Sequence, residues 1–321
     1  MPSLAPFRIY AVSLVFIGAL YFLLFYAGQQ DFSYIVVGYS ISFLASAFLS
    51  FYLPPGVRIS SFLVVLSTLM AVFSFPALSD DVYRFLWDGH LISDGIDPLR
   101  FTPAELQAGL SYEPYTSLYP KLNSKNYHTV YPPVGQLIFI LSILAGKWGL
   151  PAVVVMKAIY ATIHLLGLAA ITQCLKVEHR SRVLTFYGLN PLVITEGIGN
   201  LHAEVVMVGF LFMAFWFFKK SKSVASALFF ALAVAAKLLP LMFLPLLWRL
   251  SKDKGKWMAY VVFFIGLIFI PFFWMFYAGG FVDSLDLYFR KFEFNAGLYY
   301  VLRWVGRAIT GYNLIQWLGP M

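Results

Sequence analysis

Long uninterrupted apolar runs constrain this chain more than any other feature. Three of them, at about residues 7–27, 34–53 and 60–78, precede the first cluster of charged residues. Roughly 20 apolar residues cross a bilayer as a helix, and a spanning segment must satisfy its own backbone hydrogen bonds. A membrane barrel would instead show short segments of alternating hydrophobicity. The sequence therefore predicts an all-α polytopic integral membrane protein.

Composition narrows the class further. The chain is 60% hydrophobic and 12% charged, and it has a single cysteine, Cys174. One cysteine rules out an intramolecular disulfide and a cysteine-based metal site. The net charge of +8 is also seen in nucleic-acid-binding proteins, but here the lysines and arginines lie in short loops between apolar runs, as the positive-inside rule predicts. We therefore expect membrane lipids, and no nucleic acid, as partners.

The basic residues also orient the chain. If Arg8 and Arg58 are cytoplasmic, the third apolar run ends on the extracytoplasmic side. Residues 79–131 then form an extracytoplasmic loop, and a connection of this length indicates a function. We accordingly divide the chain into an N-terminal transmembrane hairpin, residues 1–59, and a transmembrane module that carries the loop, residues 60–321.

The loop itself is predicted to be structured. Residues 81–92 have the pattern of an amphipathic helix, with Ser79 or Asp80 as its N-cap. Thr102 and Pro103 predict a second, short helix, in which the threonine caps the first turn and the proline fills its first position. We therefore expect a folded extracytoplasmic segment.

The second half of the chain is less regular. Apolar runs at about 134–149 and 152–175 lead to a basic loop at 176–182. Two full crossings would place this loop outside, against its charge, so we expect one run to be short, tilted or re-entrant. Later basic loops flank residues 223–248, which are expected to form a hairpin of two short helices broken at Lys237–Pro240 near the outer face.

Polar residues from distant parts of the sequence meet on the outer face in this topology. They are Asp80 with Asp81, His202 with Glu204, Lys237, and Arg290 with Lys291. A carboxylate pair beside a membrane helix is costly. We expect one aspartate to be a general base, with its neighbour orienting it or binding a metal. The alternative for this pair is a helix cap that interacts with the helix dipole.

The other polar groups also have two interpretations each. His202 and Glu204 either hold sugar hydroxyls and orient the base, or form a satisfied polar pair at a helix end. Lys237 lies more than one turn inside an apolar run, where a fixed cation suits a phosphate, although a lone lysine can also snorkel. Arg290 either contacts the phosphate or is, like Lys291, a solvated loop residue.

Short motifs in a fixed order carry a resemblance to a known family. They run from about residue 79 to 305 and comprise Asp80-Asp81-Val82-Tyr83-Arg84-Phe85-Leu86-Trp87-Asp88-Gly89, Gly95-Ile96-Asp97-Pro98, Tyr131-Pro132-Pro133, Asn190-Pro191-Leu192, Gly199-Asn200-Leu201-His202-Ala203-Glu204, Lys237-Leu238-Leu239-Pro240 and Phe292-Glu293-Phe294-Asn295. Each motif alone is weak, but the ordered set resembles bacterial polyprenyl-phosphate-mannose-dependent mannosyltransferases and related glycosyltransferases of the GT-C superfamily.

The resemblance implies a GT-C-like helix bundle in the bacterial inner (plasma) membrane, with its active site on the extracytoplasmic side. Asp80 or Asp81 would deprotonate a hydroxyl of a glycan or lipid acceptor, which attacks mannose on a polyprenyl phosphate with inversion. The residues that we expect to bind substrate are Arg84, Asp88, His202, Glu204, Lys237 and Arg290. A divalent cation, Mg²⁺ or Mn²⁺, stays open because no ligand spacing is recognisable. Relatives usually continue further at the C-terminus, so the resemblance also implies a truncated chain.

Two other functional classes are compatible with parts of the sequence. A transporter or flippase for a lipid-linked or anionic substrate would also use a broken helix with a lysine, but its polar groups would lie near the bilayer midplane. A transferase needs them at one rim beside a structured loop, and residues 79–131 favour this interpretation. A non-catalytic membrane scaffold would tolerate the loss of both Asp80 and Asp81.

Overall fold

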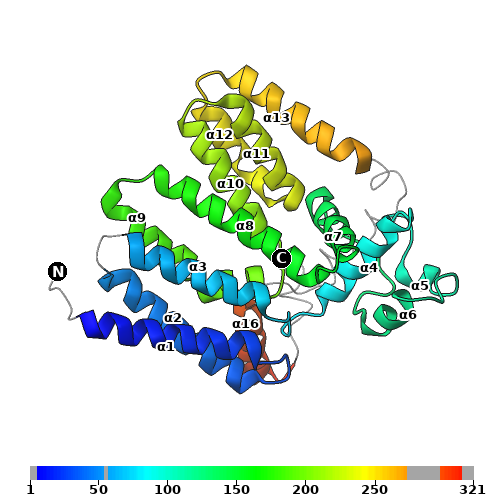
Figure 1. Ribbon diagram of the computed structural model, residues 1–321, viewed down its shortest axis with the longest axis horizontal. Helices are drawn as coiled ribbons and strands as arrows, with labels where there is room; N and C mark the ends of the chain where they lie inside the picture. Colours follow the sequence, from blue (N-terminus) through cyan, green and yellow to red (C-terminus); the bar gives the residue numbers. More distant parts are fainter. Residues whose placement is uncertain (1–5, 54–56, 273–296, 313–321) are drawn as a thin grey trace.

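The apolar runs form helices in the computed structural model, which describes residues 6–53, 57–272 and 297–312. Within these ranges every regular element is a helix, and the predicted all-α class is confirmed. Four helices are long and apolar enough to cross a membrane, and a bent pair raises this number to five. Figure 1 shows α1, α2, α3 and α8 lying side by side.

The first three helices follow the first three apolar runs. α1 covers Pro6–Phe25, α2 covers Phe32–Tyr52 and α3 covers Val57–Phe73. α3 stops at Phe73 rather than near residue 78, because Pro76 disfavours helical backbone in the residue before it. The segment after α3 can therefore turn away from the helix axis before it reaches the acid pair.

α8, Ala152–Gln173, runs antiparallel to α3. Lys157, near its start, donates a hydrogen bond to the backbone oxygen of Ser74 just beyond the end of α3 (2.6 Å). Leu168, about three turns later, lies with Val64 of α3 against one glycine of the following segment. The start of α8 is thus level with the end of α3.

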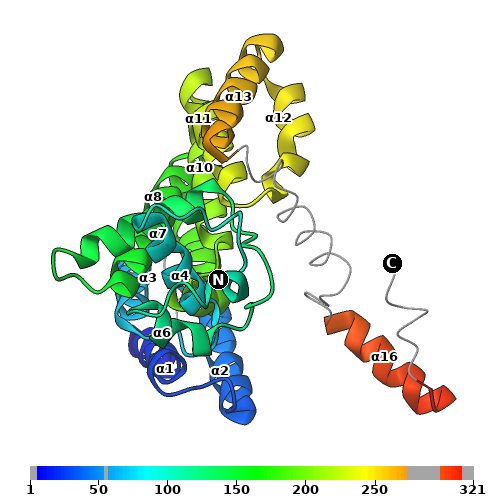
Figure 2. The same ribbon diagram turned by 90° about the vertical axis from the view of Figure 1, so that its right-hand side faces the viewer.

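A second group of helices packs on the other side of α8 (Figure 2). It consists of α10 (Glu204–Lys219), α11 (Ser223–Ala236), α12 (Leu244–Leu250) and α13 (Lys254–Phe269). α8 and α10 approach closely, since a Cβ on Gly167 would lie 2.6 Å from Cα of Gly209. Small residues at such a crossing are typical of helix pairs in membranes.

The basic loops gather at one end of the bundle, which we call the basic end. Lys219 and Lys220, at the end of α10, act electrostatically on Cys174 at the end of α8. Trp257, next to the last basic loop, donates to Ser226 near the start of α11 (3.2 Å). The basic end therefore carries Arg58 and residues 176–182, which include α9 (Val177–Val183), 219–222 and 249–256.

The opposite end, which we call the loop end, carries the expected amphipathic helix α4, Asp81–Ser93 (Figure 1). Ser79 acts as its cap, because its Oγ accepts a hydrogen bond from the backbone N–H of Asp81 (3.3 Å). Asp80 occupies the N-cap position but makes no side-chain capping bond. Its carboxylate is therefore not committed to the helix.

Two short helices and a buried cluster complete the loop. α5, Pro103–Leu106, begins with the predicted cap, since Thr102 and Glu105 form a reciprocal capping box. α6, Tyr115–Leu118, continues into a 3₁₀ turn, Tyr119–Lys121. The loop has its own small core, which consists of Trp87, Leu91, Leu110, Tyr115, Leu118 and Leu122.

α7, Pro133–Gly146, is too short to cross a membrane, which removes the conflict between two crossings at 134–175 and the charge of the loop at 176–182. It has 14 residues, fewer than the roughly 20 that cross a bilayer. It lies along α4 in the same direction, since Phe85 stacks on Phe139 with ring centroids 4.6 Å apart and Gly89 lies against Ile143. α7 is therefore the short run that the positive-inside rule predicted. Of the runs at 134–149 and 152–175, only the second, which forms α8, is long enough to cross a membrane.

Candidate active site

A bent helix pair forms the centre of the site. Residues 184–199 form two π-helical segments, η2 (Leu184–Gly188) and η3 (Val193–Gly199). Pro191 separates them, because proline interrupts helical hydrogen bonding. η3 and α10 meet at 104°. We call residues 200–203, which join them, the corner. π-Helical turns are rare in proteins, and those that occur are often found at functional sites.

The corner has an uncommon backbone conformation and a fixed position. Leu201 is buried and has a φ of 61°, a left-handed conformation that L-residues other than Gly, Asn and Asp adopt rarely. Asn200 donates to the backbone oxygen of Thr195 (3.1 Å), and its Oδ1 accepts from the backbone N–H of Leu78 (3.1 Å). The corner is thus tied to the segment that leads from α3 to the acid pair.

The acid pair lies directly after this contact. Asp80 is exposed, and its carboxylate makes no hydrogen bond to any part of the chain that the structure describes. Asp81 is half-buried, and its Oδ1 accepts from the Asn123 side chain (3.2 Å). One carboxylate is therefore open to a ligand, and its neighbour is held in place.

Glu196 of η3, which was not expected from the sequence, joins three elements. Its Oε1 accepts from the Tyr39 hydroxyl of α2, and its Oε2 accepts from Asn200 (3.2 Å). His202 Nδ1 lies 3.7 Å from the same Oε2, and the His202 side chain is 39% exposed. A carboxylate thus lies next to an accessible imidazole at the corner. An acidic residue inside an apolar run is the signal that could have identified Glu196.

Lys237 and Glu204 form a salt bridge at the opening between α10 and α11. Lys237 follows the last residue of α11 in an extended conformation, with φ −161° and ψ 138°, so the helix breaks where the sequence predicted. The Lys237 and Glu204 side chains are 42% and 53% exposed. An exposed pair contributes little stability, so an anionic ligand is able to compete for the ammonium group.

Arg84 and Asp88 point into the protein instead. They form an ion pair of 2.8 Å, with exposed fractions of 3% and 0%. Arg84 also donates to the backbone oxygens of Ser124 and Tyr127 (3.1 and 2.9 Å), and Gln136 of α7 donates to Asp88 (3.2 Å). Both charges are satisfied within the loop, so we assign them to its support and leave them out of the proposed substrate contacts.

The family is decided by a match that spans all of these residues. The family model described as alpha-(1->6)-mannopyranosyltransferase, N-terminal domain, matches residues 23–252, which include the acid pair, the corner and Lys237. The chain belongs to the alpha-(1->6)-mannopyranosyltransferase family. The resemblance read from the motifs is therefore confirmed.

A curated member of this family gives a direct comparison. Alpha-(1->6)-mannopyranosyltransferase A of Corynebacterium glutamicum is 26% identical over 203 residues, which are 58% of this chain and 39% of the relative. The chain thus matches well under half of the relative's length. No solved structure matches the chain.

Lys157 is a second residue of this family member that the sequence did not single out. It is fully buried in α8, and its ammonium group donates to the backbone oxygens of Ala71 (3.2 Å) and Ser74 (2.6 Å) and to Ser74 Oγ (3.1 Å). It therefore satisfies the Ser74 carbonyl oxygen beyond the end of α3, and it gives the Ala71 oxygen a second donor beside the Ser74 hydroxyl. A lysine inside a long apolar run is a signal in its own right.

Arg290 and Lys291, with Glu293 and Asn295, lie outside the described residues. Among the described residues, no three side chains of metal-binding type gather. Mg²⁺ is commonly held by one or two carboxylates together with substrate phosphates. A divalent cation at the acid pair therefore stays a prediction.

Proposed function

We propose that this protein is an integral membrane mannosyltransferase that moves mannose from a polyprenyl phosphate to a hydroxyl of a glycan or lipid acceptor. The observation that carries the proposal is the hydrogen bond between Leu78 and Asn200 (3.1 Å), which brings the acid pair to the corner. Such a transfer needs acidic, imidazole and ammonium groups. These groups are far apart in the family-matched sequence and lie at the same end of the bundle.

The acid pair starts the reaction. Asp80 or Asp81 takes the proton of the acceptor hydroxyl, and Asp80 is the better placed because its carboxylate is exposed and uncommitted. The acceptor oxygen attacks the anomeric carbon from the side opposite the phosphate. The bond from that carbon to the phosphate oxygen breaks, the phosphate oxygen keeps the electron pair, and the configuration inverts.

Lys237 stabilises the leaving group. Polyprenyl phosphate departs as an anion, and a fixed cation lowers the barrier where negative charge develops. The donor phosphate replaces Glu204 as the partner of the Lys237 ammonium, and Arg290 adds a second cation. Glu204 and His202 then hold mannose hydroxyls, with His202 oriented by Glu196.

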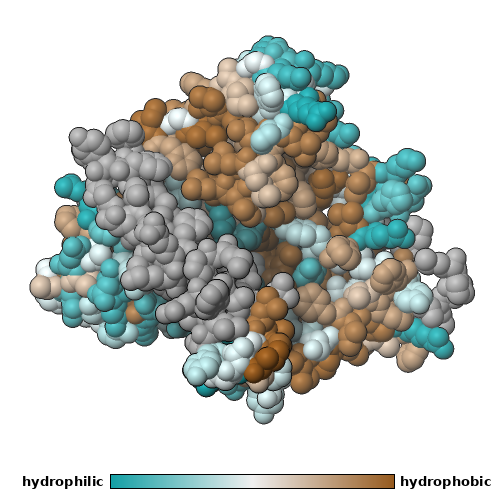
Figure 3. Space-filling view, turned by 180° about the vertical axis from the view of Figure 1, so that it is seen from behind, coloured by the Kyte–Doolittle hydropathy of each residue, from teal (hydrophilic) through white to brown (hydrophobic). Residues whose placement is uncertain are grey.

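The surface around the corner suits a donor with an anionic head and a long apolar tail. A cavity of about 540 Å³ lies along α2, lined by Ile35, Val36, Tyr39, Ser40, Phe43 and Leu44. Tyr39 connects this cavity to the corner through its hydrogen bond to Glu196. Figure 3 shows extensive hydrophobic surface and a hollow in which hydrophilic atoms are visible. The tail lies along α2, and the phosphate faces the corner.

Charge distribution supports an extracytoplasmic site in the bacterial inner membrane. The positive-inside rule places the basic end in the cytoplasm, and the acid pair and the corner lie at the opposite end. A transporter would instead need its polar groups near the middle of the helices. The Glu204–Lys237 pair lies at helix ends, which favours the transferase.

The test is a donor assay with purified protein in lipid. A panel of polyprenyl-phosphate sugars is supplied with a mannoside acceptor, and release of polyprenyl phosphate is measured. We expect release from the mannose donor. Absence of release from every donor, or movement of an intact donor across the membrane, would overturn the proposal. Chelation followed by Mg²⁺ or Mn²⁺ addition tests whether a cation accompanies the donor.

A further inference from the structure

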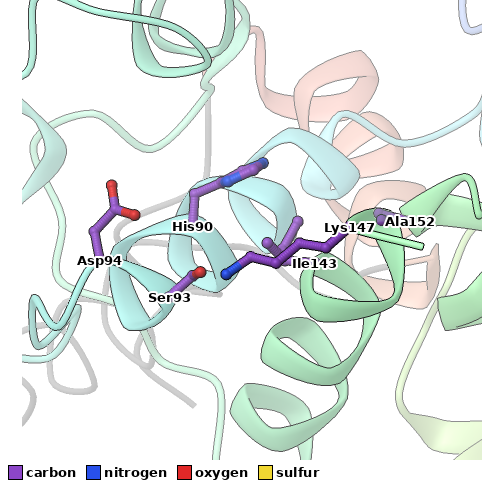
Figure 4. A pocket seen from close by; sticks show the side chains of 7 residues that line it. His90, Ser93, Asp94, Ile143, Lys147 and Ala152 are labelled. Carbon is purple, nitrogen blue, oxygen red and sulfur yellow. The ribbon is translucent and has the colours of Figure 1, made fainter. Parts of the chain in front are cut away.

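Another cavity, which contains several polar side chains, lies at the end of α4 that is farther from the acid pair (Figure 4). Its volume is about 460 Å³, and its lining consists of His90, Ser93, Asp94, Ile143, Gly146, Lys147 and Ala152. These residues come from the ends of α4 and α7 and the start of α8. α4 has 13 residues, about 20 Å in length, so this cavity is separate from the acid pair.

The polar groups of the cavity are open to a ligand. Within the described chain, Lys147 and Ser93 make no side-chain hydrogen bond or ion pair, and Figure 4 shows the Lys147 nitrogen reaching toward Ser93. The Tyr112 and Tyr115 hydroxyls both donate to Oδ2 of Asp94 (3.2 and 2.8 Å). Among the described residues nothing bonds the other oxygen, Oδ1, which stays available as an acceptor.

We propose that this cavity is a subsite for a neutral saccharide, the part of the acceptor glycan that lies away from the reacting hydroxyl. The inference rests on the proposed function. One ammonium, one carboxylate, one hydroxyl and one imidazole supply both donors and acceptors with no net charge, which matches a polyhydroxyl ligand. An anion such as phosphate would meet the Asp94 carboxylate.

Two neighbouring features support a sugar. The Tyr112 ring is 49% exposed and is held edge-on to Tyr115, with centroids 5.3 Å apart, so it offers a fixed face for stacking. Burial lowers the pKa of His90, partly opposed by the nearby Asp94 carboxylate. A neutral imidazole both donates and accepts hydrogen bonds, as sugar recognition requires.

The position of the cavity makes the proposal specific. An acceptor that fills the cavity and also reaches the acid pair must extend along α4 for about 20 Å. A single mannoside cannot do this, whereas a chain of several sugars can. Changes in the cavity should therefore affect long acceptors and leave short ones unaffected.

Gly146→Phe is the decisive variant. Gly146 lines the cavity, and a Cβ added there meets nothing within 4 Å, so we expect a phenylalanine side chain to occupy part of the cavity. Gly18→Phe is the matched control, because Gly18 also has open space but lies on α1. We expect α-(1→6)-linked mannotriose to bind the full-length protein and the control in saturation-transfer NMR, and binding to be lost in Gly146→Phe. Equal binding to all three proteins would show that the subsite is wrong.

Kinetics and competition separate this proposal from the proposed function. For a long mannan acceptor, Gly146→Phe and Lys147→Met should raise KM about tenfold without changing kcat, and a single mannoside should be unaffected. Suppose that the wild type binds mannotriose, that Gly146→Phe does not, and that the wild type releases no polyprenyl phosphate. This result would support the subsite and contradict the proposed transferase activity. Inorganic phosphate that displaces mannotriose from the wild type would mark the cavity as an anion site and overturn the subsite.

Discussion

Two ion pairs at the loop end use the same chemistry for opposite purposes. Arg84 and Asp88 are 3% and 0% exposed, and backbone and side-chain groups of the loop bind them further. Glu204 and Lys237 are 53% and 42% exposed, and the pair lies at the end of two helices. A buried charge with hydrogen-bond partners supports the folded structure. An exposed charge in a salt bridge can exchange its partner for a ligand.

The acid pair and Lys157 extend the same contrast. Asp80 is exposed and uncommitted, and Lys157 is fully buried with three acceptors around its ammonium group. Asp80 lies on the segment from α3 to α4, and Lys157 of α8 holds the start of this segment through Ser74. We therefore expect substitutions at the exposed residues to change activity, and substitutions at the buried ones to change stability first.

Asp80→Asn and Asp81→Asn should have the largest effect. Loss of a general base lowers the rate of transfer roughly 10²–10⁴-fold. Unfolding in detergent should be unchanged for Asp80→Asn, because Asp80 is exposed and makes no capping bond. Polyprenyl phosphate release and a thermal melt measure the two quantities. Asp97→Asn, in the same loop, is the control. Full turnover in both variants of the acid pair would remove the assignment of the base.

Arg84→Ala should destabilise the protein by about 3–5 kcal/mol, because it leaves the Asp88 carboxylate buried without a partner. Chemical unfolding in detergent and proteolysis of the loop measure this loss. The double variant Arg84→Met/Asp88→Leu should recover part of this stability, since it removes the unpaired buried charge but leaves the Ser124 and Tyr127 oxygens without their Arg84 donor. Unchanged stability with weaker substrate binding would restore the role expected from the sequence.

Lys157→Met should cost about 1–3 kcal/mol, because the buried carbonyl oxygen of Ser74 loses its donor. Transfer should slow as well, since the segment that carries the acid pair is released. Thr162→Val on the exposed face of α8 is the control. A Lys157→Met protein with the stability and activity of the wild type would show that the buried contacts are dispensable.

Lys237→Ala should have the smallest effect on the fold and a specific effect on the donor. Loss of an exposed salt bridge changes stability by about 0–1 kcal/mol, whereas KM for the polyprenyl-phosphate donor should rise about tenfold. Lys219→Ala at the basic end is the matched control. If the donor KM does not change, Lys237 does not bind the phosphate.

Several features were predictable because they depend on nearby residues. The helices α1 and α2, the amphipathic helix α4, the Thr102 capping box and the break at Lys237 follow from hydrophobic periodicity and from capping residues. The sequence placed the end of the third helix near residue 78, five residues beyond its end at Phe73. The division of residues 184–199 at Pro191 was not predicted. Both corrections come from prolines within apolar runs, where hydrophobicity outweighed the local signal.

The sequence by itself determined the membrane class, the order of helices and the resemblance to a mannosyltransferase family. The tertiary structure decided which charges are enclosed and which are open. Arg84 is satisfied by residues 40 and 43 positions away, Lys157 by a residue 83 positions away, and Glu196 by Tyr39 at a separation of 157. The cost of a buried charge depends on such distant partners, so local sequence patterns carry no record of it.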